Sequence, residues 1–523
     1  MTSDLVRDVR ATLMPGFVGL AAPAWLLDLL PEGLESACLY GANVRDREQV
    51  TNIGRALRLA NGHVLAAIDE EGGEVTRLHY VDGSPYPGAA VLGRIGDAQY
   101  THRVGRDVGE DALSAGFDLV LAPVADINSN PANPVIGTRS FGATPQVVAD
   151  QVEAWLRGCA ATGAIPCVKH FPGHGDTNAD SHLELPTVGA SAATLRDREL
   201  VPFVAAIAAG AQAIMTSHIV LKALDPTAPA TLSAPILTDL LRGELGFTGV
   251  IVSDALDMKG ASGTIGIPAA AVRSLGAGCD LLCLGPGTTP ALLDAVESAI
   301  VNAVDEGVLP RSRVAQAAAR VRQLGRRSQP GPAESDKSRD ALDSPQAPRY
   351  FGPAPTVPRR GDDGLVASSF TIDSRAARIL KSSTAATIVQ VESPSNIAVG
   401  SAAWGPLAAV RADPALGEVA TAEGPRDPAW RSIAGGTVVV ATRDAALPWL
   451  GDVAAQLCAR GAAVIVADMG WPGRAGGTGV NVDDGSTASG AAISPNEPGL
   501  IMTYGSTRLV GAALVALANG ACS

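Results

Sequence analysis

The chain has 523 residues, of which 46% are hydrophobic and 18% charged, and its formal net charge is −13. A chain of this length exceeds one ordinary hydrophobic core, so we expect two domains. The excess of acidic residues argues against nucleic acid or an anionic membrane as a partner, because both require a basic protein face.

The first twenty residues, MTSDLVRDVRATLMPGFVGL, lack the basic start, the long apolar core and the small-residue cleavage site of an export signal. The sequence also has no run of about 18 apolar residues. We therefore expect a cytoplasmic protein. Its seven cysteines are an odd number at scattered spacings, so we expect reduced core residues and neither a disulfide framework nor a zinc site.

Eight short apolar runs recur through the first 290 residues, each followed by a turn and a longer stretch with helical spacing. Buried strands that alternate with helices predict a parallel sheet covered on both faces, and eight of them predict a closed (β/α)₈ barrel of the TIM type over residues 1–328. The runs are GFVGL from Gly16, ACLYG from Ala37, HVLAAID from His63, FDLVLAPV from Phe117, IPCVKHF from Ile165, QAIMTSH from Gln212, GVIVSDA from Gly249 and CDLLCLG from Cys279.

A change in composition follows the predicted barrel. Residues 329–363 are rich in proline and have almost no apolar periodicity, which predicts a linker. Strand-like runs then return as TIVQV, GTVVVATR, AAVIVADMG and LIMTYG, and they predict a smaller α/β sandwich domain over residues 364–523. The glycine-rich stretch from Met469 lacks the features of a P-loop or a dinucleotide fingerprint, so we interpret it as a surface loop.

Polar residues stand at the carboxyl ends of several runs, where barrels of this kind hold their active sites. Asp254 closes an apolar run in which a carboxylate has no packing role, and it is well placed as a nucleophile. In KHFPGHGDTNADSH, Asp180 precedes His182 by two residues, a spacing that lets the carboxylate orient the imidazole. His182 is then a candidate general acid/base. The alternative, in which these residues only cap turns and helices, stays open.

A third group of charged residues is interpreted as a substrate-binding set. Asp69 and Arg77 lie in DEEGGEVTRL, Arg139 lies in NPVIGTRSFG, and Lys169 and His170 open the histidine-rich stretch. Fixed charges around one pocket suit a neutral ligand with many hydroxyl groups, because such a ligand needs hydrogen bonds from several directions. That description fits a sugar.

The segments DEEGGEVTRL, NPVIGTRSFG, KHFPGHGDTNADSH, PATLS and GFTGVIVSDALDM, in this order, resemble the signature segments of glycoside hydrolase family 3. The similarity is to the β-N-acetylglucosaminidase branch in its two-domain form. It implies that Asp254 is the nucleophile, His182 the acid/base and Asp180 its dyad partner. It also implies no cofactor, no metal, and a set of substrate-binding residues: Asp69, Arg77, Arg139, Lys169, His170 and Met215.

The activity implied by the resemblance is an exo-acting, retaining β-N-acetylglucosaminidase that works through a covalent glycosyl-enzyme. The expected substrates are cell-wall muropeptides or chitin-derived fragments. A phosphorylase that uses the same site stays open, because an imidazole base tolerates phosphate where a carboxylate would repel it. The rivals from other classes are a metal-dependent hydrolase built on the histidines and aspartates of residues 169–182, and a sugar-binding protein without catalysis.

Some residues depart from the pattern of the resembled family. Glu70 and Glu74 stand where glutamine and arginine are frequent, and Leu78 stands where an aromatic residue is common. The two glutamates are expected to add negative charge beside Asp69, which leaves the tolerance for acidic or phosphorylated aglycones open. We expect no catalytic role for the second domain, and the sequence does not predict the oligomeric state.

Overall fold

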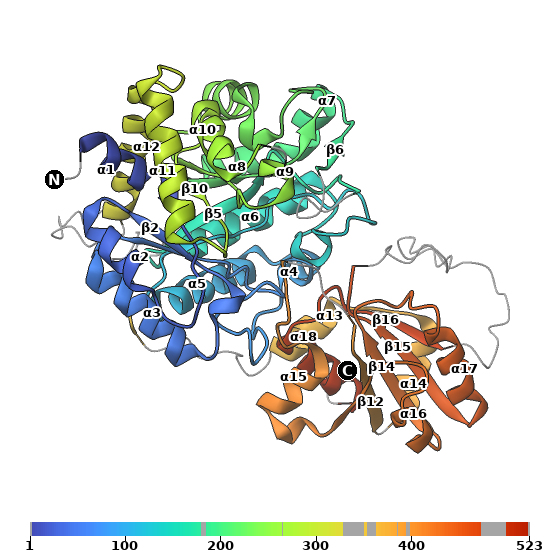
Figure 1. Cartoon of the computed structure of the whole chain (residues 1–523). Coiled ribbons are helices and arrows are strands. Elements are labelled where there is room, and N and C mark those ends of the chain that lie inside the picture. Colours follow the sequence, from blue (N-terminus) through green and yellow to red (C-terminus); the bar gives the residue numbers. More distant parts are fainter. Residues whose placement is uncertain are drawn as a thin grey trace, which may run out of the picture.

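The structure is a computed structural model, and it describes residues 3–178, 185–263, 265–327, 350–352, 362–383, 385–393, 398–471 and 498–520. Figure 1 shows a larger domain, coloured blue to yellow, beside a smaller domain in orange and red. Within the described ranges, no helix has the length and apolar character needed to cross a membrane.

The larger domain is built on eight parallel strands arranged as a ring. Six strands pair in the order β2-β3-β4-β5-β7-β9, and β1 pairs with β10. A bridge between Val252 and Leu281 connects β9 to the β10 segment, and the backbone N–H of Cys38 donates to the oxygen of Pro15 at 3.0 Å, which connects β2 to β1. The strands are β1 (Leu13–Met14), β2 (Ser36–Leu39), β3 (Leu65–Ile68), β4 (Leu119–Val120), β5 (Ile165–Phe171), β7 (Ala213–Thr216), β9 (Val250–Val252) and β10 (Leu282–Cys283).

Two hydrophobic cores explain why the strands read as continuous apolar runs. Alternate side chains of all eight strands fill the barrel interior, and Val321 and Leu324 of α12 (Arg311–Arg327) pack against them. The other strand residues pack outward against the helices in a second, larger core. Each strand is therefore buried on both faces, as expected for a parallel sheet covered by helices.

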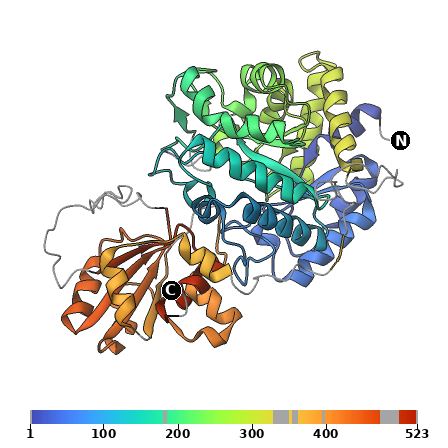
Figure 2. The same cartoon turned by 180° about the vertical axis from the view of Figure 1, so that it is seen from behind.

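Helices and short turns surround the barrel, and Figure 2 shows them from behind as an outer layer. The helices are α1 (Asp4–Ala11), α2 (Ala24–Leu29), α3 (Arg47–Ala60), α4 (Ala89–Ile95), α5 (Ala98–Ser114), α6 (Pro145–Ala160), α7 (Ala192–Thr194), α8 (Val201–Ala208), α9 (Lys259–Ser262), α10 (Ile267–Ala277) and α11 (Pro290–Asp305), followed by α12. The shorter or π-type turns are η1 (Leu30–Glu32), η2 (Gly41–Asn43), η3 (Gly137–Arg139), η4 (Leu195–Glu199), η5 (Ala230–Leu232) and η6 (Pro235–Glu244). Outside the barrel, β6 (Thr187–Val188) pairs with β8 (Val220–Leu221).

The predicted (β/α)₈ barrel is confirmed, but the position of its first strand is wrong. The prediction began at Gly16, whereas β1 ends at Met14. Val18 and Leu20, which made the run look buried, are 74% and 44% exposed. Gly16 lies against the backbone of Gly285, so the apolar run GFVGL belongs to the loop that leaves the barrel. The run from Ala37 overlaps β2, which begins one residue earlier, and the other six runs contain the observed strands.

The smaller domain is a six-stranded sheet of order β11-β16-β15-β14-β12-β13, in which β11 alone is antiparallel. Helices α13 and α18 pack with the sheet in one hydrophobic core. Helices α16 and α17 pack in a second core, against the strand residues that alternate with those of the first core. The strands are β11 (Thr371–Ile372), β12 (Ala386–Val391), β13 (Val419–Ala422), β14 (Gly436–Thr442), β15 (Ala462–Asp468) and β16 (Gly499–Met502). The helices are α13 (Asp362–Ser368), α14 (Ser374–Ser382), α15 (Gly405–Ala412), α16 (Ala429–Ser432), α17 (Leu450–Ala459) and α18 (Arg508–Ala518), with the turn η7 (Pro414–Leu416).

Most of the predicted linker, residues 329–363, lies outside the described residues. Its described part includes Tyr350 and Phe351, which pack on the barrel. The Tyr350 hydroxyl donates to Asp118 at 3.0 Å, and the guanidinium carbon of Arg58 lies 4.1 Å from the centre of the Tyr350 ring. This part of the chain is therefore held on the barrel surface.

The loop after β3 forms hydrogen bonds with the second domain. The backbone N–H of Ala403 donates to the oxygen of Tyr80 at 3.0 Å, and that of Arg508 donates to Ser84 at the same distance. The backbone N–H of Ser506 donates to the Glu74 carboxylate at 3.2 Å. Hydrogen bonds thus hold the second domain against a loop that also carries candidate site residues.

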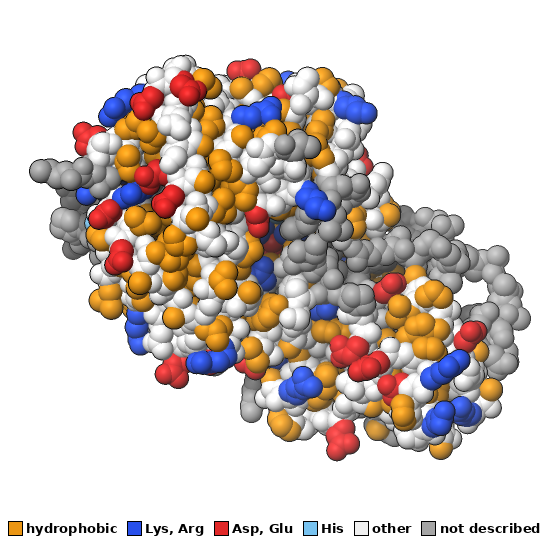
Figure 3. Space-filling model, viewed as in Figure 1, with side chains coloured by type: hydrophobic (Ala, Val, Ile, Leu, Met, Phe, Trp, Pro, Cys, Tyr) orange, Lys and Arg blue, Asp and Glu red, His pale blue; other side chains and the backbone are white. Residues whose placement is uncertain are grey.

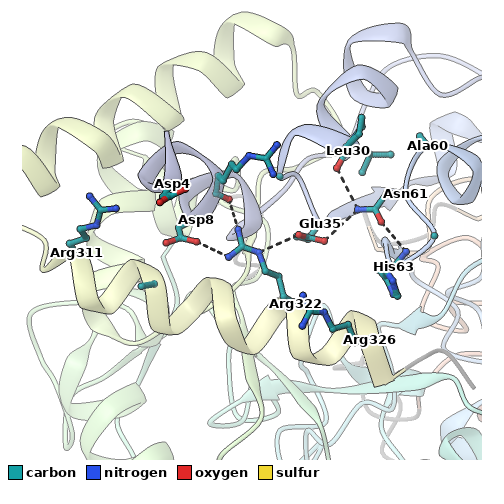
Figure 4. A pocket seen from close by; sticks show the side chains of 15 residues that line it. Asp4, Asp8, Leu30, Glu35, Ala60, Asn61, His63, Arg311, Arg322 and Arg326 are labelled. Carbon is teal, nitrogen blue, oxygen red and sulfur yellow. Dashed lines mark hydrogen bonds and ion pairs between the residues drawn. The ribbon is translucent and has the colours of Figure 1, made fainter. Parts of the chain in front are cut away.

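A hollow of about 1000 Å³ lies at the amino-terminal ends of the strands, where α12 meets the segments that precede β1, β2 and β3. Arg322 of α12 joins two of these segments, with the Asp8 carboxylate at 2.6 Å and that of Glu35 at 3.3 Å (Figure 4). This end of such barrels serves stability, and catalysis belongs to the opposite end. We therefore assign these ion pairs to closing the barrel.

Candidate active site

A second pocket, of about 370 Å³, opens at the carboxyl ends of the strands, and the second domain contributes Ala398, Val399 and Gly400 to its wall. Figure 3 shows one face of the molecule, where the described acidic and basic side chains are scattered over both domains. Seven of the nine residues predicted from the sequence line this pocket: Asp69, Arg77, Arg139, Lys169, His170, Met215 and Asp254.

Asp254 lies two residues beyond β9, at the strand end that faces the pocket. Its own carboxylate accepts a hydrogen bond from the backbone N–H of Ala255 at 2.8 Å. Its backbone N–H donates to the Thr216 hydroxyl at 3.4 Å. A rigid strand thus carries a carboxylate to the pocket with a fixed backbone, which is the arrangement that a nucleophile requires.

A buried hydrogen-bond network behind Asp254 includes the PATLS segment. The hydroxyl of Thr231 lies 2.7 Å from that of Thr216 and 2.9 Å from Nδ1 of His218. Nε2 of His218 lies 2.9 Å from the backbone oxygen of Ala255, which accepts a hydrogen bond from the ring. His218 is fully buried, so it positions the turn that carries Asp254. His218 is the last residue of the predicted run QAIMTSH, and its partners were not predicted from the sequence.

A cluster of alternating charges forms the opposite side of the pocket. The Lys169 ammonium donates to Asp69 at 2.9 Å and lies 2.8 Å from the Glu71 carboxylate. Arg139, at the end of η3, donates to both oxygens of Glu71, at 2.7 and 3.0 Å. Glu71 was not among the predicted site residues, although DEEGG places it two residues after Asp69, on the same side of an extended segment.

The charges in this cluster stabilise one another. Burial raises the pKa of Glu71, but Arg139 and Lys169 outweigh this effect and lower the pKa to about 2. Burial acts in the same way on Asp69, whose pKa is nevertheless lowered by Lys169 and Arg77. For Lys169, burial lowers the pKa, but Asp69 and Glu71 raise it above its usual range. At neutral pH the pocket therefore holds fixed cations and anions side by side. The cations can donate hydrogen bonds to the hydroxyl groups of a ligand, and the carboxylates can accept hydrogen bonds from them.

Arg77 links the pocket to the second domain. Its Nη2 donates to the Ala398 oxygen at 3.1 Å and lies 3.5 Å from the Asp69 carboxylate. Its Nε is buried and has no hydrogen-bond partner among the described residues. The second domain therefore holds a guanidinium that faces the pocket.

The expected effect of Glu70 and Glu74 is wrong, because neither side chain lines the pocket. Glu70 is fully buried, and its carboxylate accepts from the backbone N–H groups of Arg77 and Leu78 at 2.9 and 3.0 Å. Burial raises its pKa. Glu74 instead accepts from Thr138 and from the second domain, so it serves the contact between domains.

His170 is held by a buried carboxylate. Its Nδ1 lies 2.6 Å from Oδ2 of Asp126, whose other oxygen accepts from the backbone N–H of His174 at 2.7 Å. Burial raises the pKa of Asp126, but the two histidines outweigh this effect and lower it. An ionised Asp126 accepts a hydrogen bond from Nδ1 of His170 and so fixes a ring proton on that nitrogen. Nε2 of His170 is the ring nitrogen that does not contact Asp126. Burial lowers the pKa of His174 to about 4, so this imidazole is neutral at physiological pH.

Comparison with known proteins agrees with this geometry. Residues 28–324 match the model of the glycosyl hydrolase family 3 N terminal domain. The chain belongs to glycosyl hydrolase family 3. The resemblance noted from the motifs is thereby confirmed.

Several known proteins resemble the chain over different lengths. A β-hexosaminidase of Stenotrophomonas maltophilia (strain K279a) is 35% identical over 55% of this chain and 88% of its own. The β-hexosaminidase A of Pseudoalteromonas piscicida is 37% identical, but the match spans only 44% of that protein and 47% of this chain. A family 3 β-N-acetylglucosaminidase structure from Paenibacillus sp. str. FPU-7 covers 100% of this chain and 98% of its own, with a TM-score of 0.80 and 27% identity.

Two predicted members of the site, Asp180 and His182, lie outside the described residues. Among the residues that are described, no group of three or more His, Cys, Asp or Glu side chains is arranged to hold a metal ion.

The segment that leads to Asp180 is anchored by η4, where the Arg198 guanidinium donates to Asp176 at 2.5 Å and to Glu199 at 2.6 Å. Gly173 lies directly on the Glu199 side chain.

Glu199 is expected to make stability depend on pH. Burial raises its pKa to about 7, although Arg198 opposes the shift. Between about pH 4.5 and 7 the folded chain then holds a proton that the unfolded chain has lost, so stability falls as the pH rises. Glu199→Gln is expected to be more stable than the parent at pH 8, by on the order of 2 kcal/mol, and nearly equal to it at pH 4.5.

Thermal unfolding of the parent and the variant at the two pH values measures this difference. Glu244→Gln is a matched control, because Glu244 also pairs with an arginine of η4 but is exposed to solvent. A stability gain for Glu199→Gln that is equal at both pH values would contradict the assignment.

Proposed function

We propose that the chain is an exo-acting, retaining β-N-acetylglucosaminidase. The observation that carries this proposal is the placement of Asp254 at the end of β9, in one pocket with the Asp69–Lys169–Glu71–Arg139 cluster. Two similar proteins are named β-hexosaminidase A and β-hexosaminidase, which supports an N-acetylhexosamine as the sugar that is released. As substrates we propose small cell-wall or chitin-derived fragments, met in the cytoplasm.

The charged cluster is assigned to the sugar that is released. Asp69 accepts hydrogen bonds from its hydroxyl groups, and Lys169 and Arg139 donate to them, because all three groups are ionised at neutral pH. His170 adds its Nε2, and Met215 packs on the apolar face of the ring. Several charge-assisted hydrogen bonds from one rigid cluster orient the anomeric carbon toward Asp254.

The reaction then follows two displacements. The Asp254 carboxylate attacks the anomeric carbon, and the bond to the leaving oxygen breaks as His182 gives that oxygen a proton. An ester between the sugar and Asp254 results. His182 then takes a proton from water, whose oxygen attacks the same carbon and releases Asp254, so the β configuration is retained. Asp180 orients His182 and stabilises its charged form.

Proton NMR of the reaction on nitrophenyl β-N-acetylglucosaminide tests this proposal. We expect β-N-acetylglucosamine as the first product, at a rate that is the same with and without phosphate. Formation of N-acetylglucosamine 1-phosphate would instead make the chain a phosphorylase with the same site. The absence of turnover, together with binding of N-acetylglucosamine, would leave only a sugar-binding protein.

The role of His182 has its own test. For His182→Ala we expect kcat/KM on chitobiose to fall by about 10³-fold, because the sugar leaving group must be protonated as it departs. A nitrophenolate leaves without a proton, so the first step on the nitrophenyl glycoside should fall much less. Burst kinetics on the two substrates measures the difference, and an equal loss on both would rule out the general-acid role.

A further inference from the structure

The second domain lies against η3, the turn that ends in Arg139 of the charged cluster. A Cβ on Gly137, the first residue of η3, would lie 3.5 Å from the Cβ of Trp471 in the second domain. Trp471 packs edge-on against Tyr504, with ring centres 6.4 Å apart. The Arg139 side chain leaves the other end of the turn and donates two hydrogen bonds to Glu71. The direction of this guanidinium therefore depends on how η3 is held.

Glu74 joins η3 to the second domain by hydrogen bonds. Its Oε1 accepts from the Thr138 hydroxyl at 3.1 Å and from the backbone N–H of Ser506 at 3.2 Å. Thr138 directly precedes Arg139 in the turn. The Nε of Arg443, which follows β14, lies 3.9 Å from the other carboxylate oxygen of Glu74. One side chain of the barrel thus connects the end of a strand in the second domain to the turn that carries Arg139.

The second-domain end of this connection is itself held in place. The Nε of Arg443 donates to the Ser506 hydroxyl at 2.9 Å, and its guanidinium carbon lies 4.4 Å from the centre of the Trp404 ring. The backbone N–H of Gly405 donates to the Ser506 oxygen at 2.8 Å. The side chains of Glu74 and Arg443 are 11% and 10% exposed. Hydrogen bonds that are shielded from water in this way are stronger than exposed ones, so the connection is rigid.

We propose that Glu74 is a positioning residue, through which the second domain orients Arg139 toward the released sugar. Glu74 is absent from the described lining of the pocket, so it acts through Thr138 and not on the sugar itself. This inference rests on the proposed function and gives the second domain a part in sugar binding. A group that holds a substrate needs such support, because a displacement of about 1 Å can cost about 100-fold in rate.

The test measures kcat/KM on nitrophenyl β-N-acetylglucosaminide and, by calorimetry, the Kd of N-acetylglucosamine. For Glu74→Ala we expect kcat/KM to fall about tenfold and Kd to rise by a similar factor. The loss stays below the full cost of a misplaced group, because Glu71 still binds Arg139. Glu74→Gln keeps an oxygen that accepts from Thr138 and Ser506, so both values should stay within about threefold of the parent.

A double-mutant cycle separates positioning from general stability. In an Arg139→Lys background, Glu74→Ala should lower kcat/KM by less than about threefold more, because lysine lacks the two-pronged contact that the turn aims at Glu71. Thr138→Val removes the hydroxyl that joins Glu74 to η3 and leaves the contacts of Glu74 with the second domain. It should lower kcat/KM by at least about threefold, and it decides the question if Glu74→Ala does not fold.

Arg94→Ala is the matched control for the contact between the domains. Arg94 of α4 donates to the Ser369 oxygen at 2.6 Å, and its guanidinium carbon lies 3.9 Å from the centre of the Tyr504 ring. It therefore also binds the second domain, but it is exposed and does not line the pocket. We expect its loss to leave kcat/KM and Kd unchanged.

Two kinds of failure are distinguishable in this experiment. If the parent protein does not turn over the nitrophenyl glycoside, the proposed function is wrong. If it does, three results would overturn the positioning role while the proposed function stands. They are a kcat/KM within threefold of the parent for both Glu74→Ala and Thr138→Val, a loss for Arg94→Ala as large as that for Glu74→Ala, and full additivity of Glu74→Ala with Arg139→Lys.

Discussion

Asp254→Asn is expected to lower kcat by about 10⁴-fold or more on every β-N-acetylglucosaminide, while N-acetylglucosamine still binds. The amide has the size of the carboxylate and can keep the hydrogen bond from the N–H of Ala255, so the turn after β9 should stay in place. It cannot form the glycosyl ester. Because the Thr231–His218 network holds the backbone of the turn that carries Asp254, the loss should appear in kcat rather than in folding.

Steady-state kinetics and thermal unfolding measure these two expectations together. Asp150→Asn serves as a matched control, because this exposed aspartate of α6 lies outside the pocket and should leave kcat unchanged. Asp254→Gly with added azide should yield the α-glycosyl azide, since a small nucleophile then enters from the side that the carboxylate occupied. A kcat of Asp254→Asn above about 1% of the parent value would be incompatible with a covalent role.

Glu71→Gln is expected to lower kcat/KM by about 100-fold, although Glu71 is not assigned to the reaction itself. Its carboxylate faces both Arg139 and Lys169 in a buried cluster. Neutralising it leaves two buried cations with Asp69 as the remaining anion, which draws Asp69 away from the sugar hydroxyls. The variant should also unfold at a lower temperature, because breaking a buried ion pair destabilises the folded state.

Glu153→Gln is the matched control for this substitution. Glu153 also pairs with an arginine, Arg157, but on the exposed surface of α6, where such pairs contribute little. We expect kcat/KM and the unfolding temperature of this control to match those of the parent. If Glu71→Gln is folded and keeps kcat/KM within threefold, the ionic cluster does not hold the sugar.

Strand ends made much of the site predictable from the sequence. Asp69, Lys169 and Asp254 follow or end apolar runs, and parallel strands bring their carboxyl ends to one edge, so three distant segments had to converge. The roles assigned to these residues remain predictions. Asp180 and His182, which the motifs also indicated, lie outside the described residues and depend on the kinetic test of His182.

Other features depend on tertiary contacts that no local pattern reports. GFVGL has the composition of a strand, but the strand LM before it pairs with β10, which lies about 270 residues away in the chain. Glu70 and Glu71 are adjacent and chemically alike, yet one accepts backbone N–H groups and the other binds Arg139 and Lys169. Only the fold decides which glutamate faces the pocket.

The contribution of the second domain to the pocket also could not be predicted from the sequence. Ala398 and Gly400 have no chemistry of their own, but their backbone contacts Arg77 and closely approaches Tyr80 at the pocket wall. We expected no catalytic role for this domain. The structure adds that it shapes the pocket through backbone atoms, which composition and motifs do not indicate.

Mass spectrometry of the protein inactivated by a 5-fluoro β-N-acetylglucosaminyl fluoride tests the central claim most directly. The fluorine at C5 slows hydrolysis of the covalent intermediate, so the sugar stays attached to the nucleophile. We predict one modified peptide, containing GVIVSDALDM, with the sugar on Asp254. A sugar on any other residue, or turnover of the reagent by a protein that never carries a label, would contradict the account.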